Sequence, residues 1–237
     1  MSTRYIFLIF FIFQIHLCAF ADHKTDSLLN IVQEYEKKEH FESDTNYIKT
    51  LINLALLYAN PRPDSSLFFS NKSFELSVKY GYPNRSLTSS SIMATIYMLR
   101  EDAQQLLQIG TEMLPIAEKI DRKALSRVYS ILGAAYYYKS MTDVTYFYQA
   151  KEMLQKALDI SEEFNDTGMI INALSNISNI YVRIFDYSSA VESLYRAIGI
   201  AERSGDETGN HISIMFYNVA SIYYEQKEYD KALIGCS

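Results

Sequence analysis

The sequence predicts an all-α fold, an α-α superhelix of about five helical hairpins that follows an N-terminal capping helix. The chain has only 8 glycines and 4 prolines among 237 residues, about 5% of the total, whereas these two residue types usually make up about 12%. No proline follows Pro115, so the second half lacks the residue that most strongly interrupts a helix. A sequence repeat with a period of about 40 residues is typical of stacked helical units.

A five-residue phrase carries the repeat: a large apolar residue, a small residue, two variable residues and a tyrosine. It occurs five times, and successive tyrosines are separated by 39, 39, 45 and 42 residues. The copies are Leu54-Ala55 with Tyr58, Met93-Ala94 with Tyr97, Leu132-Gly133 with Tyr136, Ile177-Ser178 with Tyr181, and Val219-Ala220 with Tyr223.

A second phrase follows the last three copies, an aromatic residue with alanine three positions later. It is found as Phe147 with Ala150, Tyr187 with Ala190, and Tyr229 with Ala232. Apolar and small residues at spacings of three, four and seven lie on one face of an α-helix. Each unit is therefore predicted to be a pair of helices, in which small residues permit close approach and the tyrosine fills the space beside them.

These phrases resemble the tetratricopeptide repeat, whose pattern is W-x-x-L-G-x-x-Y on one helix and small or aromatic residues on the next. The resemblance covers residues 48–237 and is clearest at 174–190 and 216–232. The tryptophan and the terminal proline of the family pattern are absent, and units of 39 to 45 residues exceed the usual length. Within this family, the sequence resembles the exported bacterial members that have extended repeats. It implies a right-handed superhelix in which the first helix of each hairpin lines a concave, protein-binding face.

The first 21 residues predict a secretory signal peptide. Arg4 precedes an apolar run at residues 5–15, and Ala19-Phe20-Ala21 has the small residues of a cleavage site. An uncleaved membrane anchor is the alternative, and a lipoprotein signal fits less well because Cys18 does not follow small residues. The sequence thus predicts an exported protein, periplasmic or secreted in a bacterium.

Residues 22–47 are predicted to form the capping segment. Within them, residues 26–43 have the pattern of an amphipathic helix, with Thr25 or Asp26 as its N-cap. Such a helix covers the apolar end of a repeat array, which a solenoid requires for solubility.

The first two hairpins depart from the repeat pattern. Ser66 and Ser73 take the alanine positions of the first, and Leu106 and Met113 take those of the second. Pro115 falls inside the second helix of the second hairpin, where we expect it to kink or break that helix.

The third and fifth hairpins differ in length. Five extra residues, which lie within 138–143, predict a longer turn in the third. The second helix of the fifth begins near Asp230 and stops at Ser237 after eight residues. The repeat array at 48–237 is therefore predicted to be truncated, with an incomplete last repeat.

The net charge limits the classes of binding partner, and the cysteine count limits the disulfide bonds that are expected. The net charge is −6, and an acidic chain does not offer the basic surface that nucleic acids require. Membrane contact is expected only through an uncleaved N-terminus or a missing downstream span. Once Cys18 is removed with the signal peptide, Cys236 is the only cysteine left, so no internal disulfide is expected.

No catalytic motif is recognisable in the sequence, and the scattered histidines His23, His40 and His211 lack partners at metal-ligand spacing. We therefore expect no enzymatic activity, no metal and no small-molecule cofactor.

The best candidate for function is a polar stripe in the fourth hairpin: Asn172, Asn176, Asn179 and Arg183. Steps of four, three and four keep these side chains within about 40° of one line along a helix. The resemblance places them on the concave face, where asparagine amides can donate to and accept from the main chain of an extended peptide.

The same register adds residues from the neighbouring hairpins. These are Arg127, Ala134, Tyr137 and Tyr138 from the third, and Tyr217, Asn218, Ser221, Tyr224 and Glu225 from the fifth. The alternative is structural, because asparagine beside the large-small pair is common in this repeat without any ligand, and Tyr136 to Tyr138 fit a half-buried position.

The sequence therefore predicts a non-catalytic scaffold that binds a protein or peptide segment. One alternative is the truncated sensory input part of a bacterial histidine kinase or transcription regulator. A second is a partner in an envelope or polysaccharide-uptake assembly.

Overall fold

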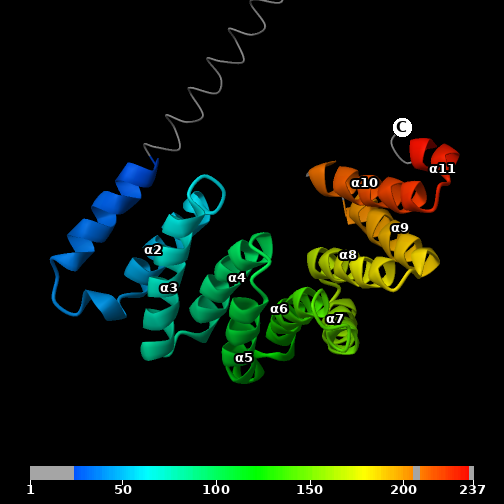
Figure 1. Cartoon of the computed structure of the whole chain (residues 1–237). Helices are drawn as coiled ribbons and strands as arrows, with labels where there is room; N and C mark the ends of the chain where they lie inside the picture. Colours follow the sequence, from blue (N-terminus) through cyan, green and yellow to red (C-terminus); the bar gives the residue numbers. More distant parts are fainter. Residues whose placement is uncertain (1–23, 205–208, 235–237) are drawn as a thin grey trace, which may run out of the picture. The chain divides into compact units, whose positions relative to one another are not determined.

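The computed structural model describes residues 24–204 and 209–234, and no strand occurs among them (Figure 1). The chain divides between Ile96 and Tyr97 into two compact units. The predicted signal peptide at residues 1–21 and the final residues 235–237 lie outside the described part.

The first unit holds an unlabelled helix at residues 24–36 and the beginning of the repeat array. It continues with η1 (Phe41–Ser43), α2 (Thr45–Tyr58), α3 (Pro63–Lys79) and most of α4 (Pro83–Leu99). Helices α2 and α3 pack together as the first hairpin.

The second unit contains the end of α4 and seven further helices. They are α5 (Ala103–Ile120), α6 (Arg122–Ser140), α7 (Tyr146–Glu163), α8 (Thr167–Arg183), α9 (Tyr187–Ser204), α10 (Gly209–Glu225) and α11 (Tyr229–Ile234). The pairs α6/α7, α8/α9 and α10/α11 form hairpins, while α5 packs on α6, α7 on α8, and α9 on α10. The predicted all-α array of helical hairpins is confirmed.

Small residues sit where helices approach most closely, as the repeat pattern predicts. A Cβ atom at Gly133 would lie 2.6 Å from Cγ of Leu154. Helices α6 and α7 can therefore approach this closely only because residue 133 has no side chain. Ala150 and Ala190, the alanines of the second phrase, are fully buried. The hairpins are thus held by close packing of short side chains.

The repeat tyrosines also mark the turns between paired helices. The amide of Asp186 donates to the carbonyl of Tyr181 at 2.9 Å, and the intervening Phe185 is left-handed with φ of 61°. This is the Schellman arrangement that ends many helices. The same bond joins Asp102 to Tyr97 and Glu228 to Tyr223.

Serines fill the alanine positions in the first unit. Ser66 is fully buried and its hydroxyl donates to the Ala55 carbonyl at 2.6 Å. The hydroxyls of Ser73 and Ser89 lie 2.7 Å apart in a hydrogen bond between α3 and α4. Because each buried hydroxyl is paired, serine replaces alanine here without leaving a polar group unsatisfied.

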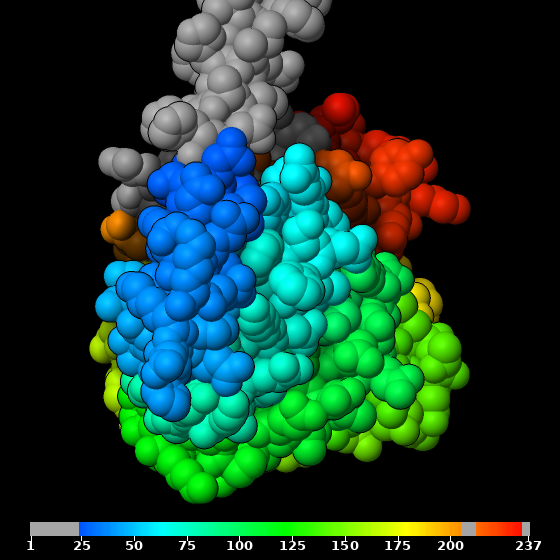
Figure 2. Space-filling model, turned by 90° about the vertical axis from the view of Figure 1, so that its left-hand side faces the viewer, coloured from blue at the N-terminus to red at the C-terminus, as the bar shows by residue number. Residues whose placement is uncertain are grey.

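The N-terminal helix is shorter than predicted: it ends at residue 36 instead of continuing to 43, and Lys24 is already helical, so neither Thr25 nor Asp26 is its N-cap. His40, with φ of 58°, turns the chain back. This reversal lets Phe41 pack edge-on against the ring of Tyr47 at 5.0 Å. The helix lies against α3 in the space-filling view (Figure 2). Glu36 at its end pairs with Lys72 of α3 at 2.9 Å.

The expectation that Pro115 breaks its helix is wrong, because α5 continues for five residues beyond it. Pro115 is exposed, so the carbonyl that loses its donor faces solvent. Met113 and Ala117 on either side are fully buried and hold the helix in place.

The longer turn of the third hairpin also lies later than predicted. Helix α6 extends through Ser140, and the turn occupies residues 141–145.

Candidate protein-binding face

Helix α8 separates a buried side from a polar side. Ile170, Leu174 and Ile177 are buried in the core of the second unit. On the opposite side Asn172 and Asn179 are exposed and Asn176 is half-buried. The polar stripe predicted from the sequence is therefore accessible. We call Asn172, Asn176 and Asn179, with Arg127 and Arg183 at the two ends, the asparagine face.

The three amides of the asparagine face have no hydrogen-bond partner within the described part of the chain. Each amide can donate two hydrogen bonds and accept two. The stripe therefore presents donors and acceptors that the described fold does not use.

One end of the asparagine face is built by Asp166, the N-cap of α8, whose carboxylate accepts from the Met169 amide at 3.2 Å. Lys123 of α6 pairs with the same carboxylate at 3.0 Å. Burial acts to raise the pKa of Asp166, but Lys123, the Met169 amide and the charge of Arg127 together hold that pKa below its ordinary value. Arg127 is exposed and lies near this cap.

The other end is built by Arg183 and Tyr137. Burial raises the pKa of the Tyr137 hydroxyl, and the nearby charge of Arg183 partly offsets that rise. Arg127 of α6 lies near the start of α8, and Tyr137 of α6 lies near the end of α8. The contacting helices α6 and α8 therefore run in the same direction. The two predicted arginines thus flank the three asparagines.

Tyr138, also predicted to face the groove, is engaged within the protein. Its hydroxyl donates to the Met98 carbonyl in the last turn of α4 at 3.0 Å. Burial raises the pKa of this hydroxyl, and the charge of Glu101 adds to the rise. Tyr138 therefore joins α6 to the end of α4, and the sequence register alone gives no sign of this bond.

Four of the five predicted residues of the fifth hairpin, Tyr217, Ser221, Tyr224 and Glu225, line a separate cavity. Tyr224 lines a pocket of about 540 Å³ between α10 and α11, whereas Asn218 is half-buried and does not line it. We call this cavity the end pocket. Its walls are Tyr217, Ala220, Ser221, Tyr224, Glu225, Tyr229, Ala232 and Leu233.

Half of the end pocket was missed by sequence reasoning. The register predicts Tyr217, Ser221, Tyr224 and Glu225 as binding residues, but the walls from α11 and Ala220 were not predicted. Ala220, Tyr229 and Ala232 are recognisable in the sequence only as repeat residues, and the repeat register gives no sign that they line a cavity.

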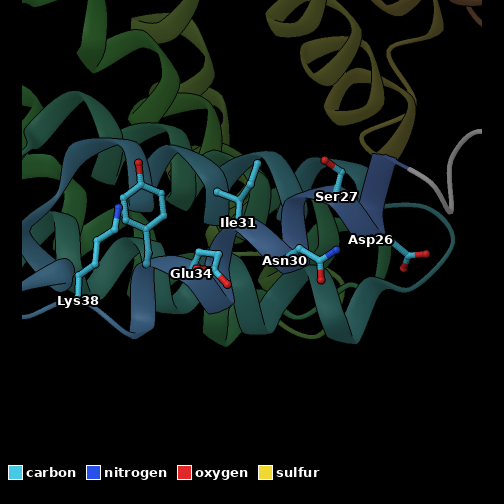
Figure 3. A pocket seen from close by; sticks show the side chains of 7 residues that line it. Asp26, Ser27, Asn30, Ile31, Glu34 and Lys38 are labelled. Atoms are coloured by element: carbon cyan, nitrogen blue, oxygen red, sulfur yellow. The ribbon is translucent and has the colours of Figure 1, made fainter.

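A second hollow lies on the N-terminal helix and is lined from one side only. Its lining residues, which include Asn30, Ile31 and Glu34, all come from the helix at residues 24–36 and the two residues after it (Figure 3). The described residues therefore supply one wall and no facing side chains.

The described residues offer neither a metal-binding cluster nor a membrane-spanning helix. No group of three histidine, cysteine or carboxylate side chains is placed to hold a metal ion in residues 24–204 and 209–234. Over the same residues, no helix has the length and hydropathy needed to cross a bilayer.

The sequence matches no protein-family model, and no curated protein is significantly similar to it. Solved structures do share its fold. BtubC (BKLC) from P. vanneervenii superposes with a TM-score of 0.68 at 14% identity, covering 91% of this chain and 87% of that protein.

Two further structures are helical-repeat proteins. A Rap protein complexed with Competence and Sporulation Factor has a TM-score of 0.60 at 16% identity, covering 90% of this chain and 70% of its own. A STAND signal-transduction ATPase with a tetratricopeptide repeat sensor, from Pyrococcus horikoshii, has a TM-score of 0.60 at 18% identity, covering 91% of this chain and 34% of its own. The fold is therefore that of tetratricopeptide-like helical repeats.

Proposed function

We propose that this protein is a non-catalytic scaffold that binds an extended segment of another protein along the asparagine face, outside the cytoplasm of a bacterium. The observation that carries the proposal is the row of three unpaired amides on α8, flanked by Arg127 and Arg183. The tetratricopeptide-like fold supports a role in protein interaction.

The spacing of the amides suits an extended ligand. Asn172, Asn176 and Asn179 are separated along the helix axis by about 6 Å and about 4.5 Å, at 1.5 Å per residue. Alternate residues of an extended chain lie about 7 Å apart. The stripe of about 10.5 Å thus spans about three residues of an extended chain, at about 3.3 Å per residue. We propose that the amides bind its main-chain groups, while the arginines bind carbonyl or carboxylate oxygens at either end.

The Rap protein supports this choice of partner. It shares the fold and was solved with Competence and Sporulation Factor bound, so a helical-repeat array of this kind is able to hold a separate factor. Because the first 21 residues predict export, we propose a partner in the periplasm or the medium.

The test is capture of the partner on the mature chain, residues 22–237, followed by measurement of its affinity. The double variant Asn176→Ala plus Asn179→Ala is expected to weaken binding at least about tenfold, because each buried hydrogen bond lost costs about 1 kcal/mol. The matched control, Asn30→Ala plus Asn84→Ala, changes two exposed asparagines of the first unit and should bind as the unchanged chain does. Equal affinities of the two double variants, with circular dichroism intact in both, reject the proposal.

A second candidate function is the sensory input part of a signalling protein. The observation that favours it is the pyrococcal ATPase, in which a tetratricopeptide repeat sensor is one part of a longer signal-transduction protein and this chain spans 34% of the length. The test is the reading frame beyond codon 237. A membrane span followed by a kinase or DNA-binding domain supports this function, and an immediate stop codon rejects it.

A further inference from the structure

Acidic residues are distributed unevenly between the two kinds of helix. The helices that contain the first four copies of the tyrosine phrase, α2, α4, α6 and α8, have no aspartate or glutamate, although the chain has 28 such residues. The helices that follow them, α3, α5, α7 and α9, each have at least two. In α10, the fifth helix with the phrase, Glu225 is the last residue and the only acidic one. Negative charge is thus almost absent from the helices that the repeat pattern assigns to the binding side.

The asparagine face lies on two of these helices, α6 and α8, which are in contact. Its two cations, Arg127 of α6 and Arg183 of α8, are exposed. Within the described part of the chain, neither guanidinium forms an ion pair or a hydrogen bond. By contrast, Arg196 of α9 is paired with Glu162 of α7. The asparagine face therefore has an unpaired cation at each end, on a chain whose net charge is −6.

Two carboxylates, Asp166 and Glu101, lie near the ends of the asparagine face. Asp166 already has an opposite charge within the fold, because Lys123 pairs with it at 3.0 Å. Burial raises the pKa of the Tyr137 hydroxyl, which the charge of Arg183 lowers and that of Glu101 raises. Glu101 belongs to the turn after α4, so it bounds the cationic region at this end. The stretch of amides between the two ends receives no negative charge from α6 or α8.

The length of the asparagine face fixes the length of ligand that reaches both arginines. Arg127 acts on the N-cap at the start of α8, and Arg183 is the last residue of that helix. Helix α8 has 17 residues and is therefore about 25 Å long. An extended chain of about eight residues covers this distance, at about 3.3 Å per residue.

We propose that the segment bound along the asparagine face is acidic, and that its carboxylate side chains pair with Arg127 and Arg183 while its main chain meets the three amides. The inference rests on the proposed function above and names the chemical class of the partner. A guanidinium donates two parallel hydrogen bonds to a carboxylate, which is stronger than a bond between neutral groups. Because the whole chain is negatively charged, general attraction does not draw an acidic segment to it, and recognition depends on these two local cations.

Two labelled peptides test this chemistry on the full chain. The first has ten residues in which glutamate and threonine alternate, because threonine favours an extended chain. The second replaces every glutamate by glutamine, which has nearly the same size and no charge. We expect fluorescence anisotropy to show saturable binding of the glutamate peptide and at least about tenfold weaker binding of the glutamine peptide. Added salt should weaken binding of the glutamate peptide.

Two matched protein variants locate the binding. Arg127→Gln plus Arg183→Gln removes the cations of the asparagine face, and Lys119→Gln plus Arg203→Gln removes two exposed cations from α5 and α9. Both double variants have the same net charge. The first should reduce the affinity of the glutamate peptide to that of the glutamine peptide, and the second should leave it unchanged. All four side chains are exposed, so both variants should fold, and circular dichroism verifies this.

Three results overturn the acidic partner. They are failure of the glutamate peptide to bind, equal affinities of the two peptides, and equal losses in the two double variants. The proposed function is tested separately by Asn176→Ala plus Asn179→Ala. If this variant weakens both peptides equally while their affinities for the unchanged chain are the same, the asparagine face binds main chain without regard to charge. The proposed function then stands and the acidic partner is rejected.

Discussion

The hydroxyl of Tyr138 donates a hydrogen bond to the main-chain carbonyl of Met98 at 3.0 Å. Tyr138 lies near the end of α6 and Met98 near the end of α4, so one side chain joins two helices that are 40 residues apart in the sequence. The repeat register assigns Tyr138 to the binding groove, but this bond gives it a structural role.

Replacement of Tyr138 by phenylalanine tests that role. We expect Tyr138→Phe to lower the free energy of unfolding by about 1 kcal/mol, because a part-buried carbonyl loses its donor. Affinity for a captured partner should not change. Urea denaturation measures the first quantity, with Tyr148→Phe as the control at an exposed site. Equal stability of Tyr138→Phe and Tyr148→Phe would show that the bond contributes nothing.

The close contact at Gly133 predicts a different kind of loss. Gly133→Ala places a methyl group 2.6 Å from Cγ of Leu154, and we expect a loss of about 1 to 3 kcal/mol from the resulting overpacking. Gly168→Ala is the matched control in α8, where the nearest atom to the new Cβ is 3.8 Å away. That change should be neutral or stabilising, by up to about 1 kcal/mol. A stable Gly133→Ala protein would contradict the close packing of α6 and α7.

Asp166 predicts a pH dependence. Its pKa is held below the ordinary value of 3.8, so the unfolded chain takes up a proton at higher pH than the folded chain does. The stability that the carboxylate contributes is complete above about pH 4 and is lost as the pH falls through the lowered pKa.

The variant Asp166→Asn isolates this contribution. At pH 7 it should be less stable by about 0.5 to 1 kcal/mol, because the start of α8 loses a favourable negative charge and Lys123 loses its partner, whereas the asparagine amide can keep the capping hydrogen bond. The difference from the unchanged protein should shrink as the pH falls below 4. Denaturation at pH 7, 4 and 3 measures it, and a difference that stays constant over this range would show that the charge of Asp166 is not responsible.

Most of the helical array is predictable because it rests on local patterns. The spacing of the repeat tyrosines and alanines locates the hairpins, and small residues such as Gly133 and Ala190 mark the buried contacts. The features that were missed depend on tertiary context. His40 has no sequence property that requires a left-handed turn, and Pro115 is tolerated because its side of α5 is exposed.

The candidate sites divide in the same way. The asparagine stripe follows from helical periodicity alone, which needs no knowledge of the neighbours of α8. The role of Tyr138 depends on a carbonyl 40 residues away, and the walls of the end pocket depend on how α11 lies against α10. Pairings of this kind are set by packing between helices and leave no mark in the repeat register.

The proposed binding of a partner protein along the asparagine face can be tested at a single position. The most direct measurement replaces Asn179 with a photo-crosslinking amino acid in the full chain, in cells that make its natural partners. The reference position is Tyr148 of α7, which is exposed. We expect a covalent adduct with a specific polypeptide from position 179, absent from position 148 and lost when Arg183→Glu is added. The same adducts from both positions, or none from position 179, would contradict it.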